Sequence, residues 1–295
     1  MNEHKLSTGH LAAVVTILLW GTTFIATKLL LDDYSPAEIL FYRFLIGFAA
    51  LLLAYPHLLK FEGLRREVYY IGAGLCGVTL YYLLENIALT YTYASNISVL
   101  LSVTPFFTAI LARLFLKETL SAYFFAGFVI AIIGIGLICF NGSRLALSPV
   151  GDVLAILAAV VWSCYSILTK KIATFGHHTI LTTRRIFAYG LLLMLPSLLF
   201  FNFRFDPARL MEAENLFNMI YLGVGASAIC FVTWNLAVKV LGAITTSVYL
   251  YLIPVITVIA ARLILHETIT PLAIAGTALI IAGLLVSGHK PKRKA

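Results

Sequence analysis

The sequence predicts an all-α integral membrane protein in which ten transmembrane helices form two inverted five-helix repeats. Hydrophobic residues make up 61% of the 295 residues and charged residues only 12%, and the mean hydropathy is +0.97. Such a composition lies far from that of soluble domains. Apolar runs of about 20 residues, long enough to cross the hydrocarbon layer, fill most of the chain. The third observation is that the two halves of the chain resemble each other.

This internal duplication is clearest between residues 94–119 and 243–268, which keep polar, proline and charged residues in one register. The matching pairs include Ser98 and Ser247, Leu101 and Leu250, Pro105 and Pro254, Arg113 and Arg262, and Glu118 and Glu267. Nearer the start of each half, Trp20, Lys28 and Arg43 match Trp162, Lys170 and Arg185. We therefore expect repeat 1 at residues 10–140, repeat 2 at 148–288 and a basic tail at 289–295.

Ten apolar runs of spanning length can be placed along the chain. Their approximate ranges are 11–31, 36–55, 69–91, 94–115, 121–140, 150–172, 181–201, 215–239, 243–265 and 271–288. Each repeat then holds five spans, and this odd number makes the second repeat enter the membrane from the opposite side. We expect inverted repeats related by an axis in the membrane plane, an arrangement that suits alternating access to one central cavity.

Basic residues in the loops predict the orientation, because Lys and Arg concentrate on the cytoplasmic side. With the N-terminus inside, the inner segments carry Lys5, Lys60, Arg65, Arg66, Lys117, Lys170, Lys171, Lys239 and the basic tail, whereas the outer loops carry Arg144, Arg204 and Arg209. We expect a multi-pass protein of the cytoplasmic (inner or plasma) membrane with both termini in the cytoplasm.

Several functional classes are disfavoured by what the sequence contains. The net charge of +8 comes partly from the short tail at 289–295, which is typical of a cytoplasmic anchor rather than a nucleic-acid-binding domain. The four cysteines lie inside apolar runs without metal-binding or disulfide spacing. No nucleotide-binding or hydrolase motif occurs. We expect no cofactor, no metal, no enzymatic activity and no nucleic-acid partner.

Polar and aromatic residues recur at helical spacing in several spans. Lipid cannot satisfy such side chains, so a stripe of them faces protein or a water-filled cavity. The candidate substrate-binding residues are Trp20, Thr23, Tyr81, Tyr82, Glu85, Asn86, Ser98, Ser102, Trp162, Tyr165, Trp234, Asn235, Ser247 and Tyr251. Close packing in the core would produce the same stripes, and both interpretations stay open. Spans 121–140 and 271–288 are nearly all aliphatic with glycines, which is typical of peripheral packing helices.

Charged residues inside the membrane are the strongest single signal. Glu85, Arg43 and Lys28 are expected in the outer third of the membrane. Lys170 and Arg185 recur at the inner end, but Trp234 stands where the first repeat has Glu85. We expect the five charged residues Glu85, Arg43, Lys28, Lys170 and Arg185 to serve coupling or gating. The alternative is a structural ion pair between Glu85 and Arg43 or Lys28.

The paired prolines Pro105 and Pro254 fall midway in their spans. Proline lacks an N–H and frees a carbonyl one turn earlier, so it kinks a helix. Their symmetric placement favours a pair of hinges, although two static kinks would leave the same pattern.

Trp20-Gly21, Arg43, YYLLENIALTYTYASN at 81–96, Pro105 and the ending Arg113-x-x-Leu116-x-Glu118 resemble the EamA family. This family belongs to the drug/metabolite transporter superfamily. The resemblance covers residues 10–288, in both halves. It implies ten helices in two EamA repeats, cytoplasmic termini, and the transport or export of small metabolites such as amino acids.

Taken with the resemblance, these features predict a secondary transporter, driven by an ion or proton gradient or by exchange, that exports amino acids or related compounds. A nucleotide-sugar or lipid-precursor translocator and a passive metabolite channel with Glu85 as its selectivity group are the alternatives. The expected partners are a small-molecule substrate and the lipid bilayer. A homodimer is left open.

Overall fold

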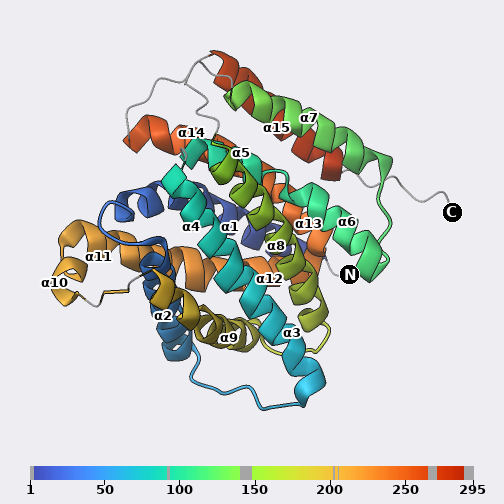
Figure 1. Cartoon of the computed structure of the whole chain (residues 1–295). Helices are drawn as coiled ribbons and strands as arrows, with labels where there is room; N and C mark the ends of the chain where they lie inside the picture. Colours follow the sequence, from blue (N-terminus) through green and yellow to red (C-terminus); the bar gives the residue numbers. More distant parts are fainter. Residues whose placement is uncertain are drawn as a thin grey trace.

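The described part of the chain in this computed structural model is helical, and no strand occurs in it. It comprises residues 3–91, 94–139, 148–201, 203–204, 206–264 and 271–288. The basic tail predicted at 289–295 lies outside the described residues. Figure 1 shows the helices packed into one bundle, with α7 and α15 side by side along one edge.

The first half holds α1 (Glu3–Leu30), α2 (Pro36–Ala54), α3 (Leu64–Gly74), η1 (Leu75–Leu80), α4 (Tyr81–Tyr91), α5 (Ala94–Leu101), α6 (Thr104–Leu116) and α7 (Ala122–Cys139). The second half holds α8 (Pro149–Ala173), α9 (Thr179–Phe200), α10 (Pro207–Leu210), α11 (Ala213–Ile220), η2 (Tyr221–Ile229), α12 (Cys230–Leu241), α13 (Ala243–Ser247), η3 (Val248–Leu252), α14 (Ile253–Ile264) and α15 (Pro271–Gly288). We call the end with residues 55–63 and 117–121 the inner end, and the end with residues 31–35 and α10 the outer end.

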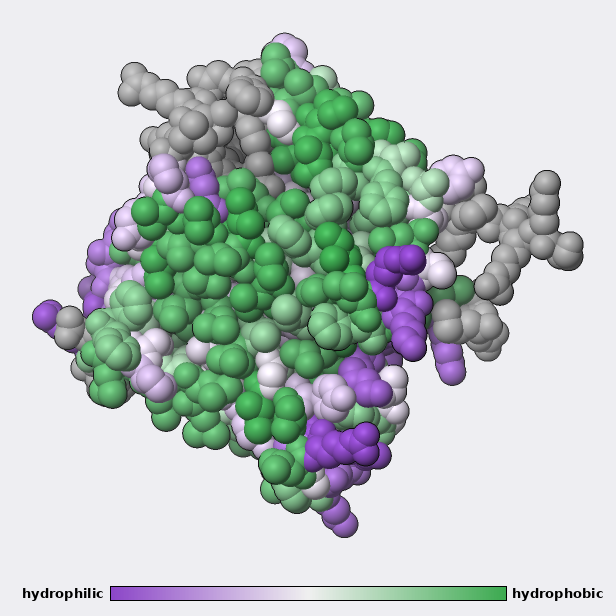
Figure 2. All heavy atoms as spheres, turned by 45° about the vertical axis from the view of Figure 1, so that its right-hand side comes forward, coloured by the Kyte–Doolittle hydropathy of each residue, from purple (hydrophilic) through white to green (hydrophobic). Residues whose placement is uncertain are grey.

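The described helices include six that are long and apolar enough to cross a membrane. These are Lys5–Leu30, Pro36–Ala54, Leu64–Tyr91, Pro149–Ala173, Thr179–Phe200 and Ala213–Leu241. Shorter apolar helices cover Thr104–Leu116, Ala122–Leu137, Ala243–Thr257 and Ile274–Ser287. Figure 2 shows a broad hydrophobic face with hydrophilic side chains gathered toward opposite ends, as expected where lipid covers the waist. The chain is therefore a multi-pass membrane protein.

Both proline-containing spans are broken rather than gently kinked. The span predicted at 94–115 divides into α5 and α6 around a turn at Ser102, and Pro105 lies in the first turn of α6. The span predicted at 243–265 passes through the tight 3₁₀ segment η3, and Pro254 follows in the first turn of α14. Proline fits the first turn of a helix because its missing N–H has no partner there. Each proline therefore marks a break in its span where the sequence predicts a kink, and its action as a hinge stays a prediction.

Two π-helical segments occur at corresponding positions in the two halves. η1 precedes α4, and η2 precedes α12, inside spans that the sequence predicts to be regular helices. A π-helix adds residues to a turn, widens the backbone and is often found at functional sites. Both segments carry glycines that let a neighbouring helix come close. A Cβ on Gly77 of η1 would lie 2.1 Å from the ring of Tyr165 on α8, and one on Gly223 of η2 would lie 2.6 Å from the side chain of Ile46 on α2.

The two aliphatic helices α7 and α15 pack along each other through glycines. A Cβ on Gly127 would lie 2.5 Å from the carbonyl oxygen of Gly283, and one on Gly134 would lie 2.6 Å from that of Gly276. These cross-pairings require the two helices to run antiparallel. Small residues let membrane helices approach closely, so the predicted role of these spans in packing is confirmed.

The two halves of the chain interlock instead of folding side by side. From the first half, α1 packs on α12 and α14 of the second half. From the second half, α8 packs on α4 and α6 of the first. The buried core is thus built at the junction between the halves.

Candidate substrate cavity

A small cavity lies near the middle of the bundle, where the two halves meet. Its predicted lining residues are Trp20, Thr23, Tyr81, Tyr82, Glu85, Ser98, Ser102 and Trp162, joined by Phe24, Leu101, Thr104, Leu250 and Ile253. The cavity has about 30 Å³ of space for water molecules. Ligand pockets typically measure about 300–1,000 Å³, so this conformation is closed around the cavity.

Helix irregularities bring these side chains together. Ser102 occupies the turn between α5 and α6, where the chain changes direction beside the cavity. The π-helical segment η1 ends directly before Tyr81, so it sets the rotation at which Tyr81 and Glu85 face inward. Gly77 in η1 admits the ring of Tyr165, because a Cβ there would lie 2.1 Å from that ring. Sequence reasoning missed both π-helical segments, since only the glycines mark them.

All three tryptophans of the chain lie in one aromatic cluster at this cavity. The ring centroid of Trp20 is 5.1 Å from those of Trp162 and Trp234, and the Tyr81 ring is 4.7 Å from Trp162. The indole N–H of Trp20 donates to the carbonyl of Ala226 at 2.9 Å. The buried indole N–H groups of Trp162 and Trp234 have no acceptor. Trp162 therefore brings an unused donor to the cavity wall.

Glu85 lies in this cavity wall, and its side chain is only 3% exposed. The described basic residues form no ion pair with it. Lys28 instead donates to the carbonyl of Leu89 at 2.6 Å. An ion pair with Lys28 or Arg43 therefore does not explain this carboxylate in the structure. A buried carboxylate with no described cation within ion-pair distance is costly, which favours a functional reason for its presence.

Arg43 is buried behind the cavity wall and is only 1% exposed. Its Nε donates to the hydroxyl of Ser227 at 3.1 Å, and its guanidinium lies 4.2 Å from the ring centroid of Tyr82. Its two terminal nitrogens have no hydrogen-bond partner. Tyr82 itself lines the cavity, so a cation–π contact couples Arg43 to the cavity wall.

The remaining predicted cavity residues do not line the cavity in this structure. Asn86 donates to the carbonyl of Pro36 at 3.1 Å. The hydroxyl of Tyr165 donates to Asn235, which donates in turn to Thr183. Each of these side chains is engaged in a contact between helices. Trp234 packs on Trp20, Ser247 donates to the carbonyl of Ile244, and Tyr251 is buried against α7 and α15.

Predicted coupling or gating residues of the second half lie at the inner end. Arg185 forms an ion pair with Glu67 at 2.7 Å and donates to the carbonyl of Lys60 at 3.0 Å. The hydroxyl of Tyr189 donates to the other oxygen of Glu67 at 2.6 Å. Lys170 donates to the carbonyl of Val238 at 3.4 Å.

The loop at residues 55–63 is thereby fastened to the second half. Arg184 donates to the carbonyls of Tyr55 and His57. Glu62 accepts from Arg66 at 2.5 Å and contacts His177 at 2.8 Å. Hydrogen bonds from these two partners lower the pKa of Glu62. The inner end is closed by polar contacts between the halves.

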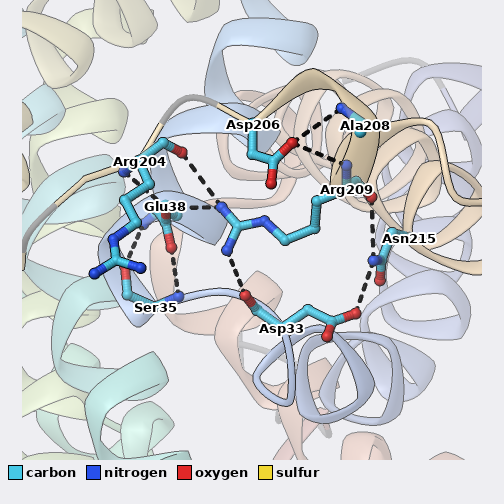
Figure 3. Close-up of polar contacts among 8 residues, drawn as sticks. All are labelled: Asp33, Ser35, Glu38, Arg204, Asp206, Ala208, Arg209 and Asn215. Atoms are coloured by element: carbon cyan, nitrogen blue, oxygen red, sulfur yellow. Dashed lines mark hydrogen bonds and ion pairs between the residues drawn. The ribbon is translucent and has the colours of Figure 1, made fainter.

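A second polar network closes the outer end, and Figure 3 shows its centre, Arg209. Arg209 donates to Glu38 at 2.9 Å and to the carbonyl of Asp33 at 2.6 Å. Asn215 donates to the carboxylate of Asp33 at 2.8 Å. Glu38 also accepts from the backbone N–H of Ser35 at 2.7 Å, within the capping box that begins α2. Sequence reasoning missed this network, because loops from different halves supply its members.

Known proteins match the chain over nearly its full length. An uncharacterized transporter of Archaeoglobus fulgidus is 30% identical over 289 residues, covering 95% of this chain and 97% of that protein. A protein of Streptantibioticus cattleyicolor named "Probable terminal-alkyne amino-acid exporter" is 30% identical over 287 residues, covering 97% and 95%. A solved crystal structure shares the fold with a TM-score of 0.73 and 21% identity, covering 95% of this chain and 96% of that one.

The family profile gives the same result for each half separately. The EamA-like transporter family matches residues 7–140 and again residues 149–288. These two matches agree with the duplication seen in the sequence. The chain therefore belongs to the EamA-like transporter family.

Proposed function

We propose that this transporter is a secondary carrier that exports amino acids or related small metabolites across the cytoplasmic membrane by alternating access. The observation that carries the proposal is a central cavity built by both halves and closed at both ends by contacts between them. Opening the outer network while the inner one stays closed would expose the cavity to the outside, and the reverse would expose it to the cytoplasm. This is what alternating access requires.

We also propose ten transmembrane helices in two inverted repeats, with the inner end in the cytoplasm. The shorter apolar helices supply the spans beyond the six long ones. The antiparallel pairing of α7 and α15, which correspond in the repeat, supports the inversion. So do two equivalent contacts at opposite ends: Lys28 to the carbonyl of Leu89, and Lys170 to that of Val238. Loop arginines and lysines support the orientation.

The cavity chemistry fits an amino acid. Glu85 is the only charged residue among the described residues of the lining, and its carboxylate can accept hydrogen bonds from a substrate ammonium. The indole N–H of Trp162, which has no acceptor in the structure, can donate to a substrate carboxylate. The aromatic rings would cover an apolar side chain. The name of the Streptantibioticus relative points to the same substrate class.

Two other functions receive less support. A nucleotide sugar or a lipid precursor carries phosphate, and a phosphate site favours arginine or lysine, which the described cavity lining lacks. A passive channel needs a continuous path, whereas polar contacts close both ends of this bundle. Coupling to protons is best assigned to Glu85, the acidic residue of the cavity, and pure exchange is the alternative.

Intrinsic fluorescence offers a direct test, because two of the three tryptophans line the cavity and the third, Trp234, packs on Trp20. Purified protein is titrated with a panel of amino acids and, as the competing class, nucleotide sugars. We expect a saturable fluorescence change with amino acids. Ser102→Leu should weaken this binding about tenfold or more, because it fills the cavity. A response to nucleotide sugars alone, or an unchanged response in Ser102→Leu, would contradict the proposal.

A further inference from the structure

A much larger cavity than the central one opens at the inner end of the molecule. It has about 1070 Å³ of space and lies between the α7–α15 pair and the start of α13. The residues that surround it come from helix ends: the start of α1, the loop before α7, the end of α8 and the end of α15. In the proposed orientation this is the depth of the lipid headgroups of the inner leaflet.

One wall of this cavity is basic. Lys117, Lys170 and His10 line it, and Glu118 supplies the one carboxylate among the described lining residues. Lys117 adopts a left-handed backbone conformation with φ of 56°, and its N–H caps α6 by donating to the carbonyl of Ala112. Such a conformation is uncommon for a residue other than glycine. It fixes the direction in which the chain presents this lysine at the end of α6.

The other wall is apolar and faces the bilayer. Phe124 at the start of α7 and Leu284 and Leu285 near the end of α15 line it. Leu285 is 70% exposed, and the neighbouring surface of α7 exposes Tyr123 and Phe125 as well. The basic wall and the apolar wall together fit an amphiphile with an anionic head.

The segment α13–η3 separates this cavity from the central one. Ile244 and Val248 face the large cavity, while Leu250 and Ile253 line the central cavity on the other side. The two spaces are thus distinct sites in this structure. A polar, enclosed centre suits a small metabolite, whereas the large inner cavity adjoins lipid.

We propose that the inner cavity binds one anionic phospholipid. Its phosphate contacts Lys117, Lys170 and His10, and its acyl chains run along the exposed apolar faces of α7 and α15. Basic pockets between membrane helices at this depth bind anionic headgroups, and each lysine contributes through its charge near the membrane surface. The bound lipid would fill the space between the α7–α15 pair and the rest of the bundle. Few of the other helices contact this pair.

The test measures retention of labelled phosphatidylglycerol by the full-length protein in detergent micelles, with phosphatidylcholine as the neutral comparison. We expect about one phosphatidylglycerol per chain and much weaker retention of phosphatidylcholine. Lys117→Gln should weaken phosphatidylglycerol binding about fivefold, and Glu118→Gln should strengthen it. Lys171→Gln is the matched control, because this exposed lysine next to Lys170 does not line the cavity.

Two further measurements complete the test. One distinguishes a loss of lipid binding from a folding defect, and the other distinguishes binding of a whole lipid from binding of a free phosphate compound. Lys117→Arg keeps the charge and should retain phosphatidylglycerol, whereas a folding defect would affect both variants at position 117. Glycerol phosphate, which has the headgroup chemistry without the chains, should not displace the lipid at millimolar concentration. Equal retention of both lipids, unchanged binding in Lys117→Gln, or displacement by glycerol phosphate would overturn the proposal.

Discussion

Cross-linking cysteines at positions 33 and 215 is expected to abolish transport. The side chains of Asp33 and Asn215 meet at 2.8 Å in the outer network, and they belong to different halves of the chain. Alternating access requires these halves to separate at the outer end. Asp33→Cys with Asn215→Cys, placed in a background without the native cysteines, brings two thiols within reach of a short reducible reagent. Transport should return when the cross-link is reduced.

A second pair of cysteines provides the control for this experiment. Glu212 and Asn215 contact each other at 3.3 Å within the second half, at the start of α11. Cross-linking Glu212→Cys to Asn215→Cys should therefore leave transport intact. A reagent that cannot cross the membrane, added to intact cells, also tests the orientation, because it reaches position 33 only if the outer end faces outside. Normal transport by the protein cross-linked between 33 and 215 would contradict the gating role of this network.

Replacing Glu85 by glutamine is expected to abolish the response of transport to a pH gradient. Glu85→Gln keeps the shape and the hydrogen-bonding capacity of the side chain but removes its titration. Since no other acid lines the described cavity, substrate exchange should persist while proton-driven accumulation disappears. The measurement compares uptake into liposomes with and without a pH difference.

An exposed carboxylate serves as the control for Glu85. Glu214→Gln removes an acidic side chain on the surface of α11 and should leave the response to pH unchanged. If Glu85→Gln kept the wild-type response of uptake to the pH gradient, proton coupling would depend on a residue other than Glu85. Loss of both exchange and accumulation would show that substrate binding needs the charge of Glu85 and not only its hydrogen-bonding oxygen.

The membrane-spanning elements were predictable because lipid imposes a simple rule on composition. Apolar runs of spanning length give the long helices, and the internal repeat aligns their equivalents. The same rule explains why much of the cavity was predictable. Polar residues such as Thr23, Glu85 and Ser102 must avoid lipid, and their helical spacing points them toward the same interior.

The rule that polar residues avoid lipid does not identify cavity residues where a polar side chain binds a partner on a neighbouring helix. Tyr165 and Asn235 follow the same stripes as the cavity residues, but Tyr165 donates to Asn235 on α12 and Asn235 donates to Thr183 on α9. The sequence contains their spacing but not the rotation and tilt of the helices that carry them. Arg43 illustrates the same limit, because its partners Ser227 and Tyr82 come from distant segments.

The polar networks at the two ends and the π-helical segments depend on tertiary contacts in the same way. Arg209 occupies a short helix between predicted spans, and nothing local indicates that it reaches Glu38. The π-helical segment η1 lies where Gly77 meets the ring of Tyr165 on α8, a contact that only the packing of the two helices reveals. Such features appear only when both halves of the chain are placed together.

Counterflow by the purified protein in liposomes tests the central claim most directly. Liposomes are loaded with an excess of unlabelled amino acid, identified by the fluorescence titration, and labelled amino acid is added outside. A carrier that alternates between two closed ends should accumulate label transiently above its equilibrium level, with a rate that saturates. Equilibration of the label without this overshoot and without saturation would contradict alternating access and indicate a passive pore.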